Sequence, residues 1–415
     1  MFKKVSHILL LAVLTSFSCA EAQQSSVVKT GIEVLTEQDF EPLKGKKVGL
    51  ITNATGVDRN LRSTIDLLFN APDIELVAMY GPEHGVRGEF AAGDKVDTYV
   101  DEYTGVTVYS LYGATRKPTP EMLEGVDILV YDIQDIGVRS YTYISTMGLA
   151  MEAAAEHDID FMVLDRPNPL GGNKVEGNIV EEGYFSFVSQ FPVPYIYGLT
   201  PGEVAKMLND EGWLKNEVQC DLTVIEMEGW NRDMTFDQTG LPWIPTSPHI
   251  PHEYSVYYYV ATGVMGELGV FSEGVGYTLP FQVFAAEWIN ETELANNMNA
   301  LELPGVKFRP IVFKPFYGRD LGKTLHGVQI HFTEYEKADL MNLQFYFMQV
   351  HKDMYPEKNI FEMGKNRWSM FEKVTGTDQI RIRFSENYEV ADIMDYLNKD
   401  VSSFKEKSQQ YYLYK

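Results

Sequence analysis

The chain of 415 residues contains very little cysteine, with Cys19 and Cys220 as the only two. Two cysteines exclude an internal disulfide framework and the zinc sites that are built from cysteine pairs. Positive charge is also scarce, because 35 basic residues face 59 acidic ones and leave a formal net charge of −24. This balance argues against a nucleic-acid partner, since phosphate binding requires a basic surface. An anionic substrate would need locally placed arginine or lysine side chains.

Apolar runs long enough to span a bilayer are absent from the sequence, so we expect no transmembrane helix. The N-terminus is typical of an export signal, since two lysines precede the short apolar run of residues 8–17 and Ala-Glu-Ala at 20–22 resembles a cleavage site. We therefore expect residues 1–22 to be a signal peptide and the protein to be exported to the periplasm. Cys19 leaves a second interpretation open, in which it carries a lipid anchor at the membrane face.

The signature motifs of several enzyme classes are missing as well. A dinucleotide-binding fold carries G-x-G-x-x-G after its first strand, whereas this chain has Thr52-Asn-Ala-Thr-Gly56 there. No G-x-S-x-G elbow of a serine esterase is present. The phosphate-loop-like stretch at 318–324 is one residue short, and we interpret it as a turn. The spacing of the acidic residues and His84 does not favour a metal site over ion pairs, so we expect no cofactor and no metal.

The sequence does contain a regular alternation of apolar strands and helices. This alternation predicts an α/β fold with a Rossmann-like, doubly wound and mostly parallel sheet. The predicted strands are 46–52, 74–79, 106–110, 126–131, 160–164 and 220–226, and the helices are 63–69, one beginning at 119, 142–157 and 200–211.

The proline-rich segment 230–251 has no regular pattern and is predicted to be a functional loop or a crossover between domains. A smaller α+β domain is expected after it. Its predicted strands are 281–289, 307–313 and 325–332, and its helices are 291–301, 340–354 and those after 390. We place the catalytic domain at 30–262 and the domain that closes the cleft at 263–415.

Charged residues follow three of the predicted parallel strands, at the edge where ligands bind in open α/β sheets. The first group, Gly81-Pro-Glu-His-Gly-Val-Arg-Gly88, places Glu83, His84 and Arg87 among glycines. The other two groups begin at Asp132 and at Asp165. A structural alternative stays open for the first group, in which Glu83 only pairs with Arg87 and His84 caps a helix.

Four ordered motifs of the chain resemble those of the exo-β-N-acetylmuramidases called NamZ, which are peptidoglycan-recycling glycosidases. The motifs are Gly81 to Gly88, Asp132-Ile-Gln-Asp-Ile-Gly-Val-Arg-Ser-Tyr-Thr-Tyr143, Asp165-Arg-Pro-Asn-Pro-Leu-Gly-Gly172 and Glu176-Gly177, and the likeness continues through Tyr197-Gly-Leu-Thr-Pro-Gly-Glu203, Trp243, Ser247-Pro248 and Glu273-Gly274. The resemblance covers essentially the whole chain after the N-terminal signal. It implies a Rossmann-like domain, a smaller second domain and a cleft between them. It also implies release of N-acetylmuramic acid (MurNAc) from the non-reducing end of peptidoglycan fragments.

Glycoside hydrolysis requires a carboxylic acid that protonates the leaving oxygen, usually with a second carboxylate opposite. The resemblance assigns the catalytic role to Glu83, and Asp132, Asp135 or Glu273 are the candidates for its partner. The acetamido oxygen of the substrate is an alternative nucleophile, and the sequence leaves this choice open. Further candidates for substrate binding are His84, Arg87, Gln134, Arg139, Tyr141, Asp165, Arg166, Asn168, Glu176, Trp243 and Glu273.

The three arginines Arg87, Arg139 and Arg166 are candidates for binding the lactyl carboxylate of MurNAc, because a guanidinium fork matches a carboxylate. Trp243 and the tyrosines at 257–259 are either sugar-stacking residues or, more commonly for aromatics, core residues. Two other functions remain open at this point. A non-catalytic muropeptide-binding protein would bind without turnover, and a metal-dependent glycan deacetylase or esterase would be inhibited by chelators.

Overall fold

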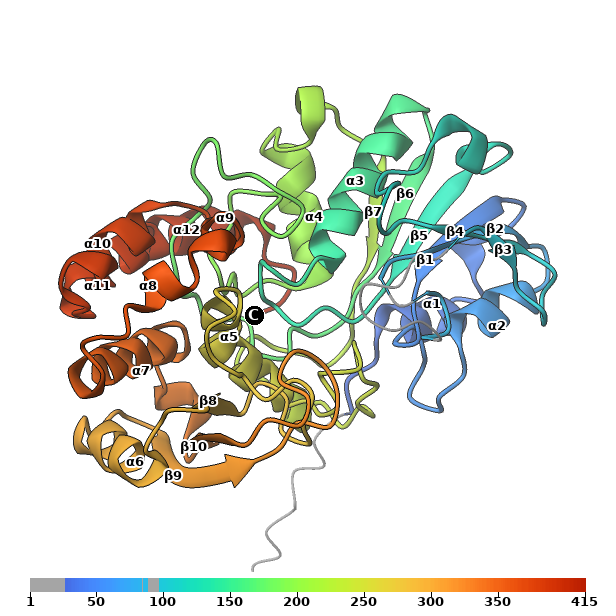
Figure 1. Ribbon diagram of the computed structural model, residues 1–415. Helices are drawn as coiled ribbons and strands as arrows, with labels where there is room; N and C mark the ends of the chain where they lie inside the picture. Colours follow the sequence, from blue (N-terminus) through green and yellow to red (C-terminus); the bar gives the residue numbers. More distant parts are fainter. Residues whose placement is uncertain (1–26, 84, 89–96) are drawn as a thin grey trace, which may run out of the picture.

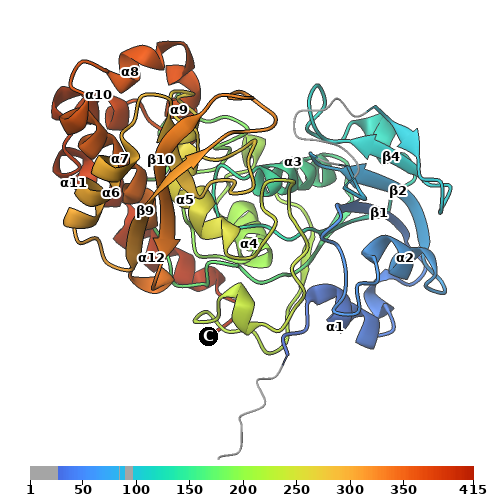
Figure 2. The same ribbon diagram turned by 60° about the horizontal axis from the view of Figure 1, so that its bottom comes forward.

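The computed structural model describes residues 27–83, 85–88 and 97–415. Figures 1 and 2 show two parts side by side, one built on a twisted sheet with helices on both faces and one built on a smaller sheet with many helices. The predicted signal peptide and the possible lipid anchor at Cys19 lie outside the described residues. Within the described ranges, no helix combines the length and the apolar character that crossing a bilayer requires.

The first part contains a seven-stranded sheet in the order β3-β4-β2-β1-β5-β6-β7. All neighbouring strands are parallel except β3, which pairs antiparallel with β4. The predicted doubly wound, mostly parallel sheet is thus confirmed. The strands are β1 (Lys47–Thr52), β2 (Glu75–Gly81), β3 (Tyr99–Val100), β4 (Thr107–Ser110), β5 (Ile128–Asp132), β6 (Asp160–Leu164) and β7 (Leu222–Ile225).

Helices cover both faces of this sheet, because its central strands are apolar on both sides. Along β5, Ile128 and Val130 belong to one buried cluster, whereas Leu129 and Tyr131 belong to another. The first cluster includes residues of α1 (Gly31–Glu37) and α2 (Thr64–Phe69), and the second includes residues of α3 (Tyr143–Glu156) and α4 (Pro201–Asp210). Near-continuous hydrophobic strands of this kind are typical of parallel sheets.

The second part contains a three-stranded antiparallel sheet in the order β8-β10-β9. Its core is shared with α5 and α7, which pack against each other. The elements are α5 (Ser255–Gly266), β8 (Val283–Ala286), α6 (Glu291–Ala300), β9 (Val306–Phe313), β10 (Leu325–Phe332), α7 (Leu340–Met354), α8 (Ile360–Met363), α9 (Trp368–Thr375), α10 (Gln379–Asn387), α11 (Ala391–Asn398) and α12 (Val401–Ser408).

Several local predictions differ from the structure. The helix expected to begin at Thr119 is only a 3₁₀ turn over Pro120–Leu123. Helices α1, α5, α8, α9 and α10 were not predicted. In α10 the run Ile-Arg-Ile-Arg-Phe alternates like a strand, yet tertiary packing selects a helix. In α5 the apolar residues surround the helix, so they have no one-sided period to detect.

The two parts of the chain are closely joined. The domain boundary that we predicted between residues 262 and 263 falls inside α5. The last residues of the chain also return to the first part, where the Tyr414 hydroxyl donates to Asp165 and the Leu413 amide donates to Glu203. A site between the two parts is therefore held from both sides.

Candidate active site

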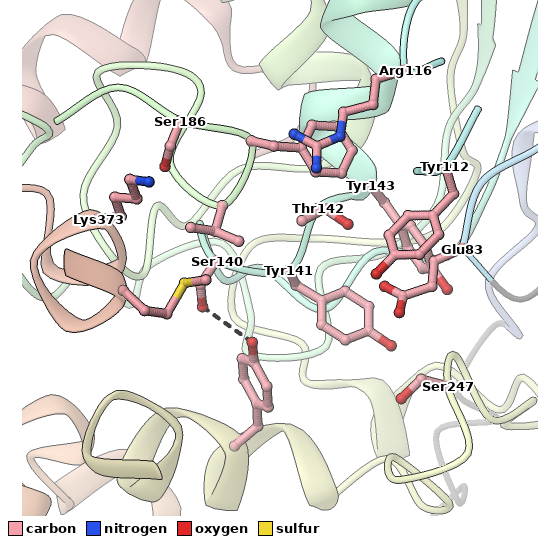
Figure 3. Close-up of a pocket in the computed structure, with 14 residues that line it drawn as sticks. Glu83, Tyr112, Arg116, Ser140, Tyr141, Thr142, Tyr143, Ser186, Ser247 and Lys373 are labelled. Carbon is pink, nitrogen blue, oxygen red and sulfur yellow. Dashed lines mark hydrogen bonds between the residues drawn. The ribbon is translucent and has the colours of Figure 1, made fainter. Parts of the chain in front are cut away.

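A cavity of about 410 Å³ lies between the two parts of the molecule, and Figure 3 shows its lining. It is large enough for a sugar-sized ligand. The lining combines hydroxyl groups, a few apolar side chains and three charged residues. The lining residues are Glu83, Tyr112, Arg116, Ser140, Tyr141, Thr142, Tyr143, Ser186, Phe187, Val188, Ser247, Tyr259, Met370 and Lys373.

Glu83 enters this cavity from the turn that follows β2. The turn folds tightly because Gly85 has a φ of +76°, which favours glycine, and a side chain at Gly81 would approach the backbone of Gly85 to 3.2 Å. Strands β2, β1, β5 and β6 are parallel neighbours, so their carboxyl ends share one edge of the sheet. The ends of the predicted parallel strands therefore lie at one edge of the sheet, as expected.

The hydroxyl of Tyr112 is the described partner of Glu83 in the cavity. Burial raises the pKa of Tyr112 to about 12, and the negative charge of Glu83 and a hydrogen bond to its carboxylate act in the same direction. Tyr112 therefore stays protonated at neutral pH and can donate to Glu83. In Figure 3 the two side chains lie next to each other at one end of the cavity.

Three tyrosines form a wall of the cavity and are fixed by hydrogen bonds at their far ends. The Tyr141 hydroxyl donates to Thr246 Oγ1 at 2.7 Å, and the Tyr143 hydroxyl donates to the carbonyl of the same threonine. The Tyr259 hydroxyl shares a hydrogen bond of 3.2 Å with Ser140 Oγ. The irregular segment 230–251 thus supplies a support for this wall, and only a 3₁₀ turn at Phe236–Gln238 interrupts its irregular backbone.

Asp132 and Arg166 bind each other behind the cavity. The Arg166 guanidinium donates from Nη2 to Asp132 Oδ2 at 2.9 Å and forms a second bond through Nε. The carboxylate also accepts from the Thr64 hydroxyl, and both charged side chains are at most 5% exposed. Neither residue lines the cavity that contains Glu83, so the structure does not support a catalytic Asp132 or a substrate-binding Arg166. The two charges neutralise each other between the loops that follow β5 and β6.

Asp135 is also buried and does not line the cavity. One carboxyl oxygen accepts from the Tyr197 hydroxyl and from the Gly137 amide, whereas the other has no hydrogen-bond partner among the described residues. Burial raises the pKa of Asp135 to about 7, although these hydrogen bonds lower it. The structure assigns Asp135 to the support of the loop after β5 and not to direct contact with substrate.

The raised pKa of Asp135 predicts a pH-dependent stability. The unfolded carboxyl titrates near 3.9 and the folded one near 7. The stabilising contribution is therefore fully present below about pH 4 and is lost as the pH rises toward 7. At about 1.4 kcal/mol for each pKa unit, a shift of about three units amounts to roughly 4 kcal/mol. As the pH rises from 4.5 to 7.5, the Tm of Asp135→Asn should therefore decrease less than the Tm of the wild type.

The measurement is Tm by calorimetry across that pH range. Asp353→Asn is the matched control, because Asp353 is exposed at the end of α7 and should follow the wild type. Asp165 has a similarly raised pKa and is retained in the variant, so part of the wild-type slope should remain. Parallel curves for wild type and Asp135→Asn would show that Asp135 titrates normally in the folded protein.

Arg139 is 1% exposed and points into the protein. Its guanidinium donates to the carbonyls of Asn178 at 2.6 Å, Val193 at 2.8 Å and Val374 at 2.9 Å. Burial lowers the pKa of Arg139 to about 10, so it remains charged at neutral pH. Because its donors are used inside the protein, the structure does not support Arg139 as the receptor of a substrate carboxylate.

Arg87 belongs to the same turn as Glu83 and forms ion pairs with Asp101 and Asp66. Its Nε lies 2.7 Å from Asp101 Oδ2, and Nη2 lies 3.5 Å from Asp66 Oδ1. Arg87 is not among the cavity-lining residues, so its placement does not support contact with substrate. His84, predicted to bind substrate, lies outside the described residues.

Three predicted residues organise the loops below the rim. Gln134 donates to the carbonyls of Asp135 and Pro167, and Asn168 bridges the Leu170 amide and the Leu199 carbonyl. Asp165 accepts from Thr200, Gly202 and Tyr414, and burial raises the pKa of Asp165 to about 7. None of the three lines the cavity that contains Glu83, and their hydrogen bonds stabilise the loops.

Glu176, Trp243 and Glu273 also lie away from the cavity lining. Glu176 pairs with Lys174 at 2.9 Å and accepts from a backbone amide of α7, next to a second cavity of about 420 Å³. Trp243 donates to the Ile250 carbonyl and packs edge-on against Phe236. Glu273 is 3.2 Å from Arg319. For Trp243, the hydrogen bond to Ile250 and the packing against Phe236 support a core residue over a sugar-stacking one.

Of the residues predicted for the site, Glu83 and Tyr141 line the cavity. The prediction missed Tyr112, Arg116 and Lys373. Tyr112 and Arg116 follow β4, whose carboxyl end lies at the same edge of the sheet as that of β2. Their position after a predicted strand could have identified them as candidates. Lys373 belongs to α9, which was not predicted, so no sequence signal pointed to it. Among the described residues, no group of three or more His, Cys, Asp or Glu is arranged to hold a metal ion.

Comparison with known proteins gives matches over the whole length of the chain. Sequence models for the N-terminal and C-terminal parts of exo-β-N-acetylmuramidase NamZ match residues 48–254 and 257–414. A curated relative, the peptidoglycan β-N-acetylmuramidase NamZ of Bacillus subtilis strain 168, is 43% identical over 418 aligned positions, which cover 100% of this chain and 99% of the relative.

Two crystal structures of DUF1343 family proteins from Bacteroides fragilis NCTC 9343 share the fold. One has a TM-score of 0.90 and 57% sequence identity, and the other has a TM-score of 0.75 and 30% identity. Each alignment covers 94% of this chain and 99% of the solved chain. The two-part architecture, the cavity between the parts and these full-length matches lead to one conclusion: the chain belongs to the exo-β-N-acetylmuramidase NamZ family.

Proposed function

We propose that this protein is an exo-acting glycoside hydrolase that releases MurNAc from the non-reducing end of peptidoglycan fragments, with Glu83 as the general acid. The observation that carries the proposal is the carboxylate of Glu83 in a sugar-sized cavity that is lined from both parts of the chain. The activity is the one named for the B. subtilis relative.

The reaction breaks the bond between C1 of MurNAc and O4 of the following N-acetylglucosamine (GlcNAc). Protonated Glu83 donates its proton to O4 as this bond breaks, so that the leaving sugar departs as a neutral alcohol. A water molecule completes the reaction by adding its hydroxyl group to C1, and its remaining proton returns to the Glu83 carboxylate. Positive charge develops on C1 and its ring oxygen in the transition state, and the acetamido oxygen of the substrate is a nucleophile that can stabilise it.

The test is incubation of the purified protein with MurNAc-β-1,4-GlcNAc. We expect free MurNAc and free GlcNAc in equal amounts, detected by mass spectrometry. The disaccharide with the reversed order, GlcNAc-β-1,4-MurNAc, is the control and should stay intact because its non-reducing sugar lacks the lactyl group. Binding of the first disaccharide without turnover would contradict the proposal. Loss of turnover with a chelator would indicate a metal-dependent enzyme instead.

We also propose that the protein acts in the periplasm or at the membrane face that borders it. The basic and apolar composition of the first 22 residues supports export. Mass spectrometry of the mature protein should find an N-terminus at Gln23 or a lipid on Cys19. An intact Met1 in fractionated cells would contradict this location.

A further inference from the structure

The cavity contains two positively charged residues in addition to Glu83. Arg116 follows β4 in the first part of the chain, and Lys373 lies on α9 in the second part. Within the described ranges, neither of them forms an ion pair or a hydrogen bond to another side chain. In Figure 3, Glu83 and Lys373 lie at opposite ends of the cavity and Arg116 lies between them.

We propose that Arg116 is the specificity-determining residue that binds the lactyl carboxylate of MurNAc, with Lys373 as a second, weaker source of positive charge. This inference rests on the proposed function, because it concerns the sugar that occupies the cavity. It replaces the assignment to Arg87, Arg139 and Arg166, whose guanidinium groups bind partners within the protein.

The aromatic ring of Phe187 holds the Arg116 guanidinium. The central carbon of the guanidinium lies 4.3 Å from the centre of the ring. A cation–π contact of this kind is made with the ring and takes no hydrogen-bond acceptor, so the N–H donors of the guanidinium are not used by it. Phe187 is therefore a positioning residue for Arg116, and the guanidinium lines the cavity with a group whose paired donors match a carboxylate.

Arg116 also acts on the end of the cavity that contains Glu83 and Tyr112. Burial and the charge of Glu83 raise the pKa of Tyr112, whereas the positive charge of Arg116 opposes this shift. The guanidinium thus acts on the tyrosine that contacts Glu83. In MurNAc the lactyl group is attached to O3, on the ring carbon that is two bonds away from C1. A ring bound with C1 at Glu83 can therefore direct its carboxylate toward Arg116.

The charge of the whole chain makes a local receptor necessary. With a net charge of −24, the protein repels anions at long range. GlcNAc lacks the lactyl group and would leave both cations of the cavity without a counter-ion. Discrimination between the two sugars therefore follows from the positive charges in the cavity and not from its shape alone.

The experiment compares two 4-nitrophenyl β-glycosides that differ only in charge, one of MurNAc and one of its lactyl amide. The wild type should prefer the acid. Arg116→Gln should lower kcat/KM for the acid by about 10- to 150-fold, the range expected for a lost hydrogen bond to a charged group. Its kcat/KM for the amide should change less than about 3-fold. Phe187→Leu should also lower the ratio of kcat/KM for the acid to that for the amide, but by less than Arg116→Gln does.

Two further variants complete the design. Lys117→Gln is the matched control, since the adjacent Lys117 pairs with Glu152 and Glu156 outside the cavity and its removal should leave the ratio unchanged. Lys373→Gln should lower the ratio only a few-fold, because an ammonium group is a point charge that cannot form the paired hydrogen bonds of a guanidinium with a carboxylate.

The inference is overturned if Arg116→Gln keeps the wild-type ratio, or if Lys373→Gln alone abolishes the preference. If the proposed function itself were wrong, the wild type would hydrolyse neither glycoside. The two failures therefore give different results.

Discussion

Replacing Glu83 with glutamine should lower kcat on MurNAc-β-1,4-GlcNAc by about 10²- to 10⁴-fold, the usual contribution of general acid catalysis. Glutamine preserves the size and much of the hydrogen bonding of the side chain, including the contact with Tyr112. It has no carboxyl proton to transfer to the leaving oxygen. The loss should therefore appear in kcat and leave Tm almost unchanged.

A substrate with a good leaving group provides the internal control for Glu83. A 4-nitrophenyl glycoside needs little protonation, so Glu83→Gln should reduce its turnover much less than that of the disaccharide. Glu75→Gln is the matched protein control, because Glu75 is exposed at the other end of the same strand, β2. Near-normal hydrolysis of the disaccharide by Glu83→Gln would remove Glu83 from the mechanism. A lowered Tm with retained turnover would indicate a structural role.

The second large effect should be on stability. Replacing Arg139 with methionine removes the donors to three backbone carbonyls, one of which, Val374, lies on α9 in the second part of the chain. Each buried polar group without a partner costs about 1–3 kcal/mol. We expect a total loss of about 3–5 kcal/mol, which corresponds to a decrease in Tm of about 4–6 °C for a chain of this length.

Arg116→Met is the matched control for this prediction, because it makes the same chemical change at an exposed side chain of the cavity. It should change substrate preference and leave Tm within about 1 °C of the wild type. Calorimetry measures both variants. An unchanged Tm for Arg139→Met, together with a selective loss of activity toward the lactyl acid, would restore Arg139 as a receptor for the substrate.

The architecture of the first part was predictable because its signals are local. Buried parallel strands appear in the sequence as short apolar runs, and the helices between them begin with recognisable caps. Ser63 accepts a hydrogen bond from the Ile65 amide at the start of α2, as expected. Thr200 and Glu203 form the predicted capping box of α4. The turn at 318–324 likewise has no helix or strand.

The candidate site was predictable only in part. Glu83 could be identified because it follows a strand whose end must lie at the ligand-binding edge of the sheet. Asp132 and Arg166 have the same kind of position, yet they bind each other. A charged group at a strand end has the same sequence pattern whether it faces a ligand or an opposite charge. The direction of the side chain decides between these outcomes.

The sequence by itself therefore determined the layered fold, the edge of the sheet at which the candidate site lies and, through four ordered motifs, the family. Only the tertiary structure decided which charged groups neutralise each other and which face the cavity. The physical reason is that pairing depends on distances of a few ångströms between residues far apart in the chain. Arg116 and Lys373 come from different parts of the protein and line one cavity only because these two parts pack against each other.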